Sequence, residues 1–509
     1  MSPRVRRRLI PLQLLPAADA RYRPVLILAI LPLLPGRVLG IGIAEVATVV
    51  RLVAVVGVGI AAASLISCGG GQANPDGGQV TEPGASAGCS DLFDPDVVRT
   101  YALEIDPAEW QSIEAEFNNT AGLATGGNEF AVYHPAVLKL DQETVANASI
   151  RLHGQSSWLQ TVMFDGPRAK MQFDVAFDKV DPNNRFHGVD KVIFDMPRSD
   201  WTFMHERLAH AWLREAGIMT GCTASARLNI NGSYYGLFVV MEDVGKSVIK
   251  QFFSANAAGD LWKAGEEPET NKDAPNYARQ QSFWDAKDLA SVSAIVDLQG
   301  TMNTWAAEAI LNDADGYYGG NHNFFIYDQG QQGFIFLPLD LDATFDWLAL
   351  FDQVGATNHP VFWWSDRAKP APTPGHVWSV VMQDEGWRRK YADAMAALLA
   401  KWDTAKIQER IDSWSKQLAP HVAEDPHSWA TPDNFNSAVQ KAREVAASRP
   451  EFLRTFIECE QNGTGADKDG DGARWCDDCR DDDASVHAGA AETCNGTDDN
   501  CNGLVDEGC

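Results

Sequence analysis

The sequence predicts an α+β fold, because segments with strand-like alternation come first and segments with helical periodicity follow. This order favours two lobes, a strand-rich first lobe and a helical second lobe, over a repeating βαβ plan. Hydrophobic residues make up 45% of the 509 residues and include 16 Trp and 23 Phe. Such a chain can fill a sizeable core, which excludes global disorder.

Periodicity and turn residues define the elements of the first lobe. The spacing of Trp110, Ile113 and Phe117, with a Pro near the start, predicts a helix over 107–117. Gly217 ends a second predicted helix, and Asn231-Gly232 supplies the positive φ angles of a tight hairpin. The second helix is predicted over 202–216, and the strands over 97–105, 131–140, 148–152, 170–177, 227–230 and 234–241.

The second lobe is predicted to contain a helix, a hairpin and three further helices. The helix spans 301–312, the hairpin pairs 323–328 with 333–337, and the later helices span 387–400, 405–418 and 435–456. Both lobes together form one domain over 89–459. A separate module rich in Cys and Asp is predicted over 460–509.

The charge balance narrows the classes of partner. The chain has 42 Lys and Arg against 69 Asp and Glu, a formal net charge of −27. Nucleic acid or an anionic membrane would need a basic patch, so neither is expected as the main partner. Long apolar runs occur only before residue 68, which argues against a polytopic membrane protein.

Residues 1–67 have the composition of an export signal. Basic residues precede apolar runs at 25–40 and 52–66. The second run leads into Leu65-Ile66-Ser67-Cys68, which resembles a bacterial lipobox in which Cys68 is lipidated; a transmembrane anchor that ends by chance in a Cys is the alternative. Residues 68–88 are rich in Gly, Ser and Pro, as a tether would be. We expect an exported, membrane-anchored lipoprotein of a bacterial envelope or surface. A later true start near Val49 or Val50 would explain the unusual length of the signal.

The cysteine pattern agrees with export. With Cys68 used for lipid, eight cysteines remain, and six of them lie from Cys459 onward. A short, Cys-dense, exported segment indicates a disulfide framework, whose pairing the sequence leaves open. Pairing of Cys89 with Cys222 is possible and equally open.

Short oxygen-bearing side chains gather in two segments of the second lobe. Asp315 lies in a loop, Asn323 begins a predicted strand, and Asp340 and Asp342 follow the partner strand. The hairpin folds the second segment back toward the first, so these groups are expected to lie close together. Such ligands suit Mg²⁺, Mn²⁺ or Ca²⁺. Taken singly, each has a structural alternative as a turn, a helix cap or a loop hydrogen bond.

A polar turn upstream is a candidate phosphate site. Arg151 precedes a turn that contains Gly154, Ser156 and Ser157, and Lys170 follows on the next predicted strand. A cation beside a Gly/Ser turn can hold phosphate groups. A buried salt bridge for Arg151 and a surface position for Lys170 are the alternatives.

Six motifs in one order resemble the spore-coat protein H (CotH) kinase family, an atypical protein-kinase-like group. They are Arg151–Trp158, Lys170, Asn231–Glu242, Leu261–Gly265, Asn312–Asn323 and Pro338–Phe345. The resemblance covers roughly residues 100–450, and the ordered set is far more specific than any one motif. His153, Gln155 and Leu339 depart from the family pattern.

The resemblance implies a two-lobed, protein-kinase-like fold that uses ATP with Mg²⁺ or Mn²⁺. Asp315 would be the catalytic residue that accepts the hydroxyl proton or orients the nucleophile. Asn323 and Asp340 would hold the metal, with Asp342 in support. The ATP contacts would come from Arg151, Gly154, Ser156, Ser157 and Lys170 around the phosphates and from Glu242 near the adenine or the hinge.

The implied activity is transfer of the γ-phosphate of ATP to Ser or Thr of envelope or secreted proteins. The alternative is a non-catalytic structural or adhesive lipoprotein of the cell surface. Scarcity of ATP outside the cytoplasm favours this alternative, whereas the presence of Lys170, Asp315, Asn323 and Asp340 together favours the kinase.

The tail contains two acidic patterns with calcium-loop spacing. The first consists of Asp467, Asp469, Asp471 and Asp478, and the weaker second of Asp498, Asn500, Asn502 and Asp506. With its Cys and Gly positions, the tail resembles a Cys-rich metal-binding repeat of exported bacterial proteins, including those of myxobacteria. We expect a disulfide-stapled module that binds Ca²⁺; an acidic disordered tail is the alternative.

Overall fold

The computed structural model describes residues 88–126, 131–198, 200–254, 256–313, 315–317, 321–345, 375–476, 478, 480–487, 489–497, 499, 500 and 506. The expected signal over 1–67, the lipidation site Cys68 and nearly all of the expected tether lie outside these residues. Within the described part of the chain, no helix has both the length and the apolar character needed to cross a membrane.

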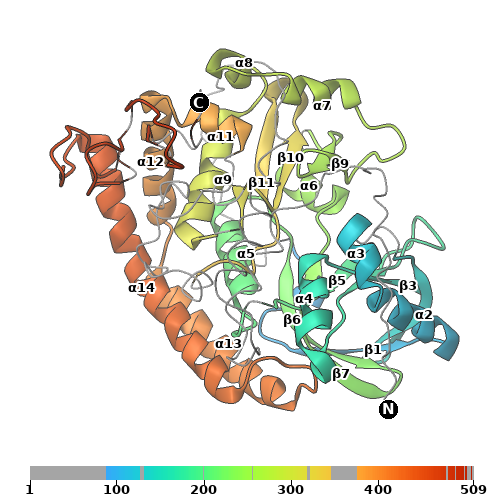
Figure 1. Ribbon diagram of the computed structural model, residues 1–509. Coiled ribbons are helices and arrows are strands. Elements are labelled where there is room, and N and C mark those ends of the chain that lie inside the picture. Colours follow the sequence, from blue (N-terminus) through green and yellow to red (C-terminus); the bar gives the residue numbers. More distant parts are fainter. Residues whose placement is uncertain are drawn as a thin grey trace, which may run out of the picture. The chain divides into compact units, whose positions relative to one another are not determined.

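The first half of the domain is a closed β-barrel (Figure 1). Its strands follow the order β1-β2-β3-β4-β5-β7-β6. Neighbouring strands are antiparallel, except that β1 runs parallel to β6 and so closes the barrel. The strands are β1 Arg99–Glu104, β2 His134–Leu140, β3 Glu143–Leu152, β4 Phe173–Ala176, β5 Lys191–Asp195, β6 Thr223–Ile230 and β7 Ser233–Glu242.

Four helices accompany the barrel. They are α2 Pro107–Phe117, α3 Thr120–Gly126, α4 Ser156–Phe164 and α5 His205–Ala216. α2 begins with Pro107 and a capping Asp106 and has the predicted bounds. Gly217 ends α5 at φ 84°, as predicted. The β6–β7 turn is also confirmed, with Asn231 and Gly232 at φ 49° and 83°.

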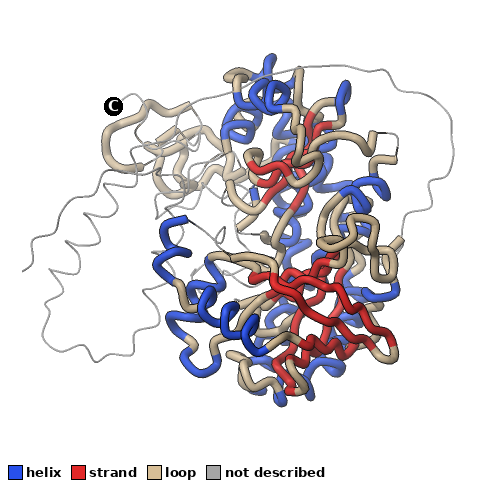
Figure 2. The backbone as a smooth tube through the Cα atoms, turned by 90° about the vertical axis from the view of Figure 1, so that its right-hand side faces the viewer, coloured by secondary structure: helices blue, strands red, loops and turns tan. Residues whose placement is uncertain are grey.

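A second sheet has four strands in the order β11-β10-β8-β9, and Figure 2 shows its strands as a group apart from the barrel. The strands are β8 Leu261–Lys263, β9 Glu267–Pro268, β10 Phe324–Asp328 and β11 Phe334–Pro338. The predicted hairpin is β10–β11, with Phe324 opposite Pro338. Helix α9 (Leu298–Leu311) packs on this sheet, where Thr304 Oγ1 donates to the Phe336 carbonyl at 2.8 Å.

Helices dominate the rest of the domain. α12 packs against both α9 and α14, and α13 packs against α14. The larger core cluster includes Trp305, Trp378, Tyr391 and Phe456, all fully buried. The remaining helices are α6 Lys246–Phe252, α7 Tyr277–Trp284, α8 Leu289–Ser293, α11 His376–Val381, α12 Glu385–Leu399, α13 Thr404–Glu424 and α14 Pro432–Asn462. The chain thus has the predicted α+β class, with strands concentrated in its first half.

Two disulfides join segments of the described chain. Cys89 bonds to Cys222, which ties the start of the domain to the edge of β6. Cys459 near the end of α14 bonds to Cys476 in the tail, and Cys494 is also disulfide-bonded. Cys479, Cys501 and Cys509 lie outside the described residues.

A buried ion pair connects the barrel to the segment between α13 and α14. Lys170 Nζ donates to Asp425 Oδ2 at 2.7 Å and to the Leu237 carbonyl at 2.5 Å, and both charged side chains are fully inaccessible to solvent. Asp425 also accepts the backbone N–H groups of Leu237 and His427, both at 2.8 Å. The Phe238 ring lies 4.4 Å from the ammonium. Burial lowers the pKa of Lys170, and the Asp425 charge opposes this shift.

We predict that Lys170→Met lowers the free energy of unfolding by about 3–5 kcal/mol, because it leaves Asp425 buried without a cation. The double variant Lys170→Met/Asp425→Asn should be less destabilised than the single variant. Urea unfolding measures both. The control is Lys441→Met, which removes an exposed ion pair with Glu444 and should cost about 0–1 kcal/mol. Equal losses for the Lys170 and Lys441 variants would contradict the prediction.

Candidate active site

Three predicted site residues meet where α9 ends and the β10–β11 hairpin begins and ends. The β10–β11 register places Asn323 and Leu339 at the same end of the hairpin, and Leu339 N–H donates to the Asn323 carbonyl at 3.2 Å. Asn323 Nδ2 in turn donates to Asp315 Oδ2 at 3.1 Å. Asp340 follows directly after Leu339. The structure therefore brings Asp315, Asn323 and Asp340 into one site. The sequence predicted this proximity, because the hairpin folds the Asp340 segment back toward Asp315.

The backbone of this site is held in an uncommon conformation. Asn312, Asn321, Asn323 and Asp340 all have positive φ, between 40° and 58°. Non-glycine residues with positive φ are uncommon and gather at functional sites. Asn312 caps α9 and donates from Nδ2 to the Phe345 carbonyl at 2.8 Å, which fixes the segment after Asp340 against the end of the helix.

Two further carboxylates, which were not among the predicted site residues, belong to the same site. Asp195 ends β5, and Glu206 lies in the first turn of α5. Glu206 Oε1 accepts a long hydrogen bond, 3.4 Å, from the Leu341 N–H, next to Asp340. Its buried Oε2 has no hydrogen-bond partner among the described residues. Acidic residues are common in the first turn of a helix, so the sequence around Glu206 gives no sign of a site. Only the tertiary fold assigns Glu206 to it.

Desolvation first, and then the charges of neighbouring carboxylates, raise the pKa values of these acids. Burial raises the pKa of Glu206 to about 8, and the Asp340 charge contributes. Burial also holds the pKa of Asp342 well above its usual range, followed by the charges of Asp340 and Asp195. Burial and the charge of Glu206 raise the pKa of Asp195. Desolvation and the charge of Asp315 raise the pKa of Asp340. The site therefore has more negative charge than its own cations neutralise.

Cationic side chains at the rim offset part of this charge. Lys263 ends β8, and Lys263, His153 and His322 each lower the pKa of Asp340. His322 Nδ1 lies 3.6 Å from Asp315 Oδ1, and this interaction raises the pKa of His322. Lys263 lies in the Leu261–Gly265 motif, but the sequence analysis assigned it no role. Because its charge acts on Asp340, Lys263 is a cation of this site that the sequence motifs did not single out.

The donor set fits a divalent cation. Asp340 is exposed to solvent. Asp342 in the same segment, and Asn323 and Glu206 from two other segments, add oxygen atoms. Mutually repelling carboxylates with an orphaned buried oxygen are what a hard cation would stabilise. Across the described residues, however, only Asp467, Asp469 and Asp471 form a trio of acidic groups with oxygens within 4.8 Å of one another. A cation at Asp340 would therefore be held by fewer carboxylates at once, together with Asn323, or would draw the carboxylates closer.

The predicted phosphate-binding turn differs from expectation in its secondary structure. Gly154 has φ 80° and leaves no room for a side chain beside Gln172, but Ser156 begins α4 and is not part of a turn between strands. Arg151 donates to Asp174 Oδ2 at 2.6 Å, so its salt-bridge alternative is also realised. His153 Nδ1 lies 3.0 Å from the other Asp174 oxygen. The pKa of Asp174 is held below its usual range against the effect of burial by Lys191, His153 and Arg151.

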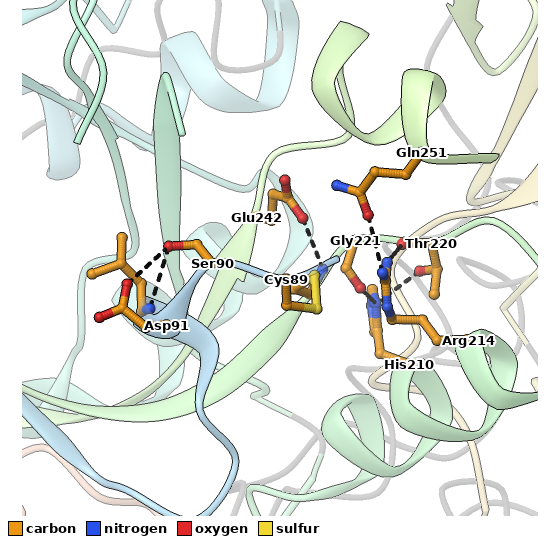
Figure 3. Close-up of a disulfide and its surroundings, with 11 residues drawn as sticks. Cys89, Ser90, Asp91, His210, Arg214, Thr220, Gly221, Glu242 and Gln251 are labelled. Carbon is orange, nitrogen blue, oxygen red and sulfur yellow. Dashed lines mark hydrogen bonds between the residues drawn. A yellow bond between two sulfur atoms is a disulfide. The ribbon is translucent and has the colours of Figure 1, made fainter. Parts of the chain in front are cut away.

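Lys170 does not face the acidic site, and Glu242 ends β7, where its predicted place near the adenine or the hinge stays a prediction. Lys170 precedes β4, where the predicted strand over 170–177 is reduced to four residues, and its ammonium group is engaged by Asp425 and Leu237 inside the protein. Lys170 therefore contacts a buried carboxylate, whereas the predicted role placed it against the phosphates of ATP. Glu242 accepts from the Cys222 N–H at 3.4 Å, beside the Cys89–Cys222 disulfide (Figure 3). Burial raises its pKa to about 7.

The first tail loop has the geometry of a cation site. The carboxylates of Asp467, Asp469 and Asp471 converge within 4.8 Å. Asp478 is 6% exposed, its Oδ2 has no hydrogen-bond partner within the described chain, and burial with the charges of Asp471 and Asp469 raises its pKa to about 6. Asp467, Asp469 and Asp471 therefore lie together, and Asp478 lies near enough for the charges of Asp471 and Asp469 to act on it.

The second tail loop is only partly described. The Asp506 carboxylate accepts the backbone N–H groups of Asn495 and Gly496 at 2.9–3.1 Å. The N–H groups of Asn500 and Asp506 donate to Glu492, so Glu492 organises this loop. Asp498 and Asn502 lie outside the described residues.

The barrel, the second sheet and the acidic site belong to one α+β domain. Residues 150–453, more than half of the chain, match the family described as CotH kinase protein, and the chain belongs to that family. Residues 478–507 match a family described as "Putative metal-binding motif". The matched range includes Asp478 but not Asp467, Asp469 or Asp471. No curated protein matches the chain.

We predict that the metal-free protein becomes more stable as the pH falls from about 8 toward 5. The raised pKa values mean that these carboxyl groups bind more protons in the folded state than in the unfolded state. This difference holds from the usual carboxyl pKa up to the folded pKa of Glu206, which is about 8. The free energy of unfolding therefore falls as the pH rises through this range. Added Mg²⁺ should therefore raise the melting temperature more at pH 8 than at pH 5.5, because protons compete with the metal.

Differential scanning fluorimetry with and without EDTA measures this difference. Asp340→Asn should remove most of the Mg²⁺ effect at pH 8, whereas the exposed control Asp273→Asn should preserve it. An equal Mg²⁺ effect at both pH values would contradict a proton-linked cation site.

Proposed function

We propose that this protein is an exported, ATP-dependent protein kinase that transfers the γ-phosphate to Ser or Thr of envelope or secreted proteins. The observation that carries the proposal is the excess of carboxylates around Asp340, placed beside Asp315 and Asn323 in a family of kinase-like proteins. Phosphoryl transfer needs little beyond positioning and neutralisation of charge, and this site offers both.

Each group at the site has a role in the proposed transfer. Asn323 and Asp340 would hold Mg²⁺ or Mn²⁺, with Asp342 in support, and the cation would supply positive charge at the triphosphate. Asp315 is oriented by the amide of Asn323 and accepts the proton of the substrate hydroxyl. The bond between the γ-phosphorus and the oxygen bridging it to the β-phosphate breaks as the hydroxyl oxygen bonds to that phosphorus, and ADP leaves.

The phosphate contacts are proposed on the rim of the site. Lys263 affects the pKa of Asp340 and can take the part first assigned to Lys170. Arg151, Gly154 and the start of α4 at Ser156 and Ser157 remain candidates, because the N-terminus of a helix favours anions. We also propose that the barrel and the helical part act as two lobes around the nucleotide, as in protein kinases.

One observation favours the non-catalytic alternative. Lys170 is committed to Asp425, so a cation in the position expected for the kinase family does not face the acidic site. A surface lipoprotein that keeps this fold without phosphoryl transfer would tolerate that arrangement. Export and lipidation at Cys68 are proposed from the sequence for both alternatives.

We predict that the purified protein incorporates phosphate from ATP with Mg²⁺ or Mn²⁺, into itself or into a casein-like substrate. Asp315→Asn and Asp340→Asn should each lower the rate by about 100-fold or more, because the first removes the proton acceptor and the second a metal ligand. Radiolabelled ATP provides the measurement, and Asp273→Asn is the exposed control.

Absence of incorporation with either metal, together with absence of a nucleotide-induced rise in melting temperature, would favour the surface scaffold. A nucleotide-induced rise without incorporation would point to a binding site that lacks the substrate or the catalytic cation. These outcomes separate a failure of catalysis from a failure of ATP binding.

The tail is proposed to bind Ca²⁺ through Asp467, Asp469, Asp471 and Asp478 and so to stiffen the disulfide-bonded segment after α14. We predict that Ca²⁺ protects this segment from proteolysis and that Asp471→Asn weakens binding by about tenfold or more, because one charged ligand is lost. Isothermal titration calorimetry measures the affinity, and Asp482→Asn is the matched control in the same tail. Equal Ca²⁺ affinities of the two variants would contradict this site.

A further inference from the structure

A small cavity lies beside the Cys89–Cys222 disulfide, on the face of α5 that carries Arg207, His210 and Arg214. Its volume is about 40 Å³, and Arg410 of α13 and the Trp414 ring complete its lining. The spacing of 207, 210 and 214 places these side chains on one face of the helix. Figure 3 shows the disulfide with His210 and Arg214 next to it.

Arg207 is a buried cation without a carboxylate partner. It is 1% exposed, and no carboxylate of the described residues lies within ion-pair distance. Its guanidinium donates to Ser225 Oγ at 2.7 Å and to the Pro95 carbonyl at 2.8 Å, and it stacks on Trp414 at 4.0 Å. The buried Nε–H has no acceptor within the described chain. An unneutralised buried charge is costly, so this group requires an anion or water.

The other charges around the cavity do not neutralise Arg207. Arg410 is paired with Glu215 at 2.7 Å. Arg214 donates to the Thr220 carbonyl and to Gln251, and the acid near it, Glu242, has a pKa raised to about 7 and so holds only part of a negative charge. Asp96 is the acid that acts on Arg207, from beyond ion-pair distance. The cavity is therefore surrounded by net positive charge.

We propose that this cavity binds one small inorganic anion of halide size, with the Nε–H of Arg207 as a donor. The volume admits a single small ion or one or two waters and excludes a nucleotide. The anion would neutralise Arg207 on the same helix that carries Glu206, which accepts from the Leu341 N–H at the acidic site and lies 3.6 Å from His210 of the cavity lining. Chloride would thereby stabilise the helix that positions Glu206.

The test compares sodium chloride with sodium gluconate at constant ionic strength, using the melting temperature of the full chain. Chloride should raise the melting temperature by about 1–3 °C with saturation, because it binds only the folded state. In Arg207→Met, which keeps the length of the side chain and removes the charge, this dependence should disappear. The control Arg389→Met, at an exposed position on α12, should retain it.

Crystals soaked in bromide provide a second measurement that does not depend on the folding of a variant. A bromide peak in the anomalous map, beside Arg207 in the cavity, would support the proposal. Water alone in the cavity, or identical melting temperatures in chloride and gluconate, would overturn it. Stabilisation by phosphate but not by chloride would also contradict a site of this size.

Discussion

A charge buried in a protein is costly unless a partner neutralises it. In this chain, buried charges with a protein partner hold the fold together, whereas buried charges without one mark candidate binding sites. Lys170 and Asp425 neutralise each other in full burial and tie the barrel to the last helices. Asp174 in β4 is neutralised by Arg151 and Lys191, and His153 Nδ1 lies 3.0 Å from its other oxygen. Where the protein supplies no such partner, the structure points to a ligand.

The acidic site is the largest of these unneutralised regions. Its carboxylates come from β5, α5, the loop after α9 and the segment after β11, so it forms only when the barrel and the second sheet are both in place. Asn323 and Asp340 both have positive φ, an uncommon backbone conformation that gathers at functional sites. The same logic applies to the Asp467–Asp471 loop and, with the opposite sign, to Arg207.

The sequence predicted the features that are set by interactions between residues close together in the chain. The Asn231-Gly232 hairpin, the bounds of α2 and the juxtaposition of Asn323 with Asp340 all follow from turn chemistry, capping or hairpin geometry. The partner of Lys170, Asp425, lies 255 residues away in the sequence, and no local pattern contains that information. The short strand β5 and the helix that begins at Ser156 were missed for a related reason, because tertiary packing decides the state of short segments.

The proposed function requires the carboxylates around Asp340 to hold a divalent cation for phosphoryl transfer. The most direct measurement is an anomalous difference map from crystals grown with Mn²⁺ and a non-hydrolysable ATP analogue. We expect a Mn²⁺ peak in contact with both Asn323 and Asp340, next to the phosphates of the analogue. Mn²⁺ bound in the tail with no peak at Asp340 would contradict the claim.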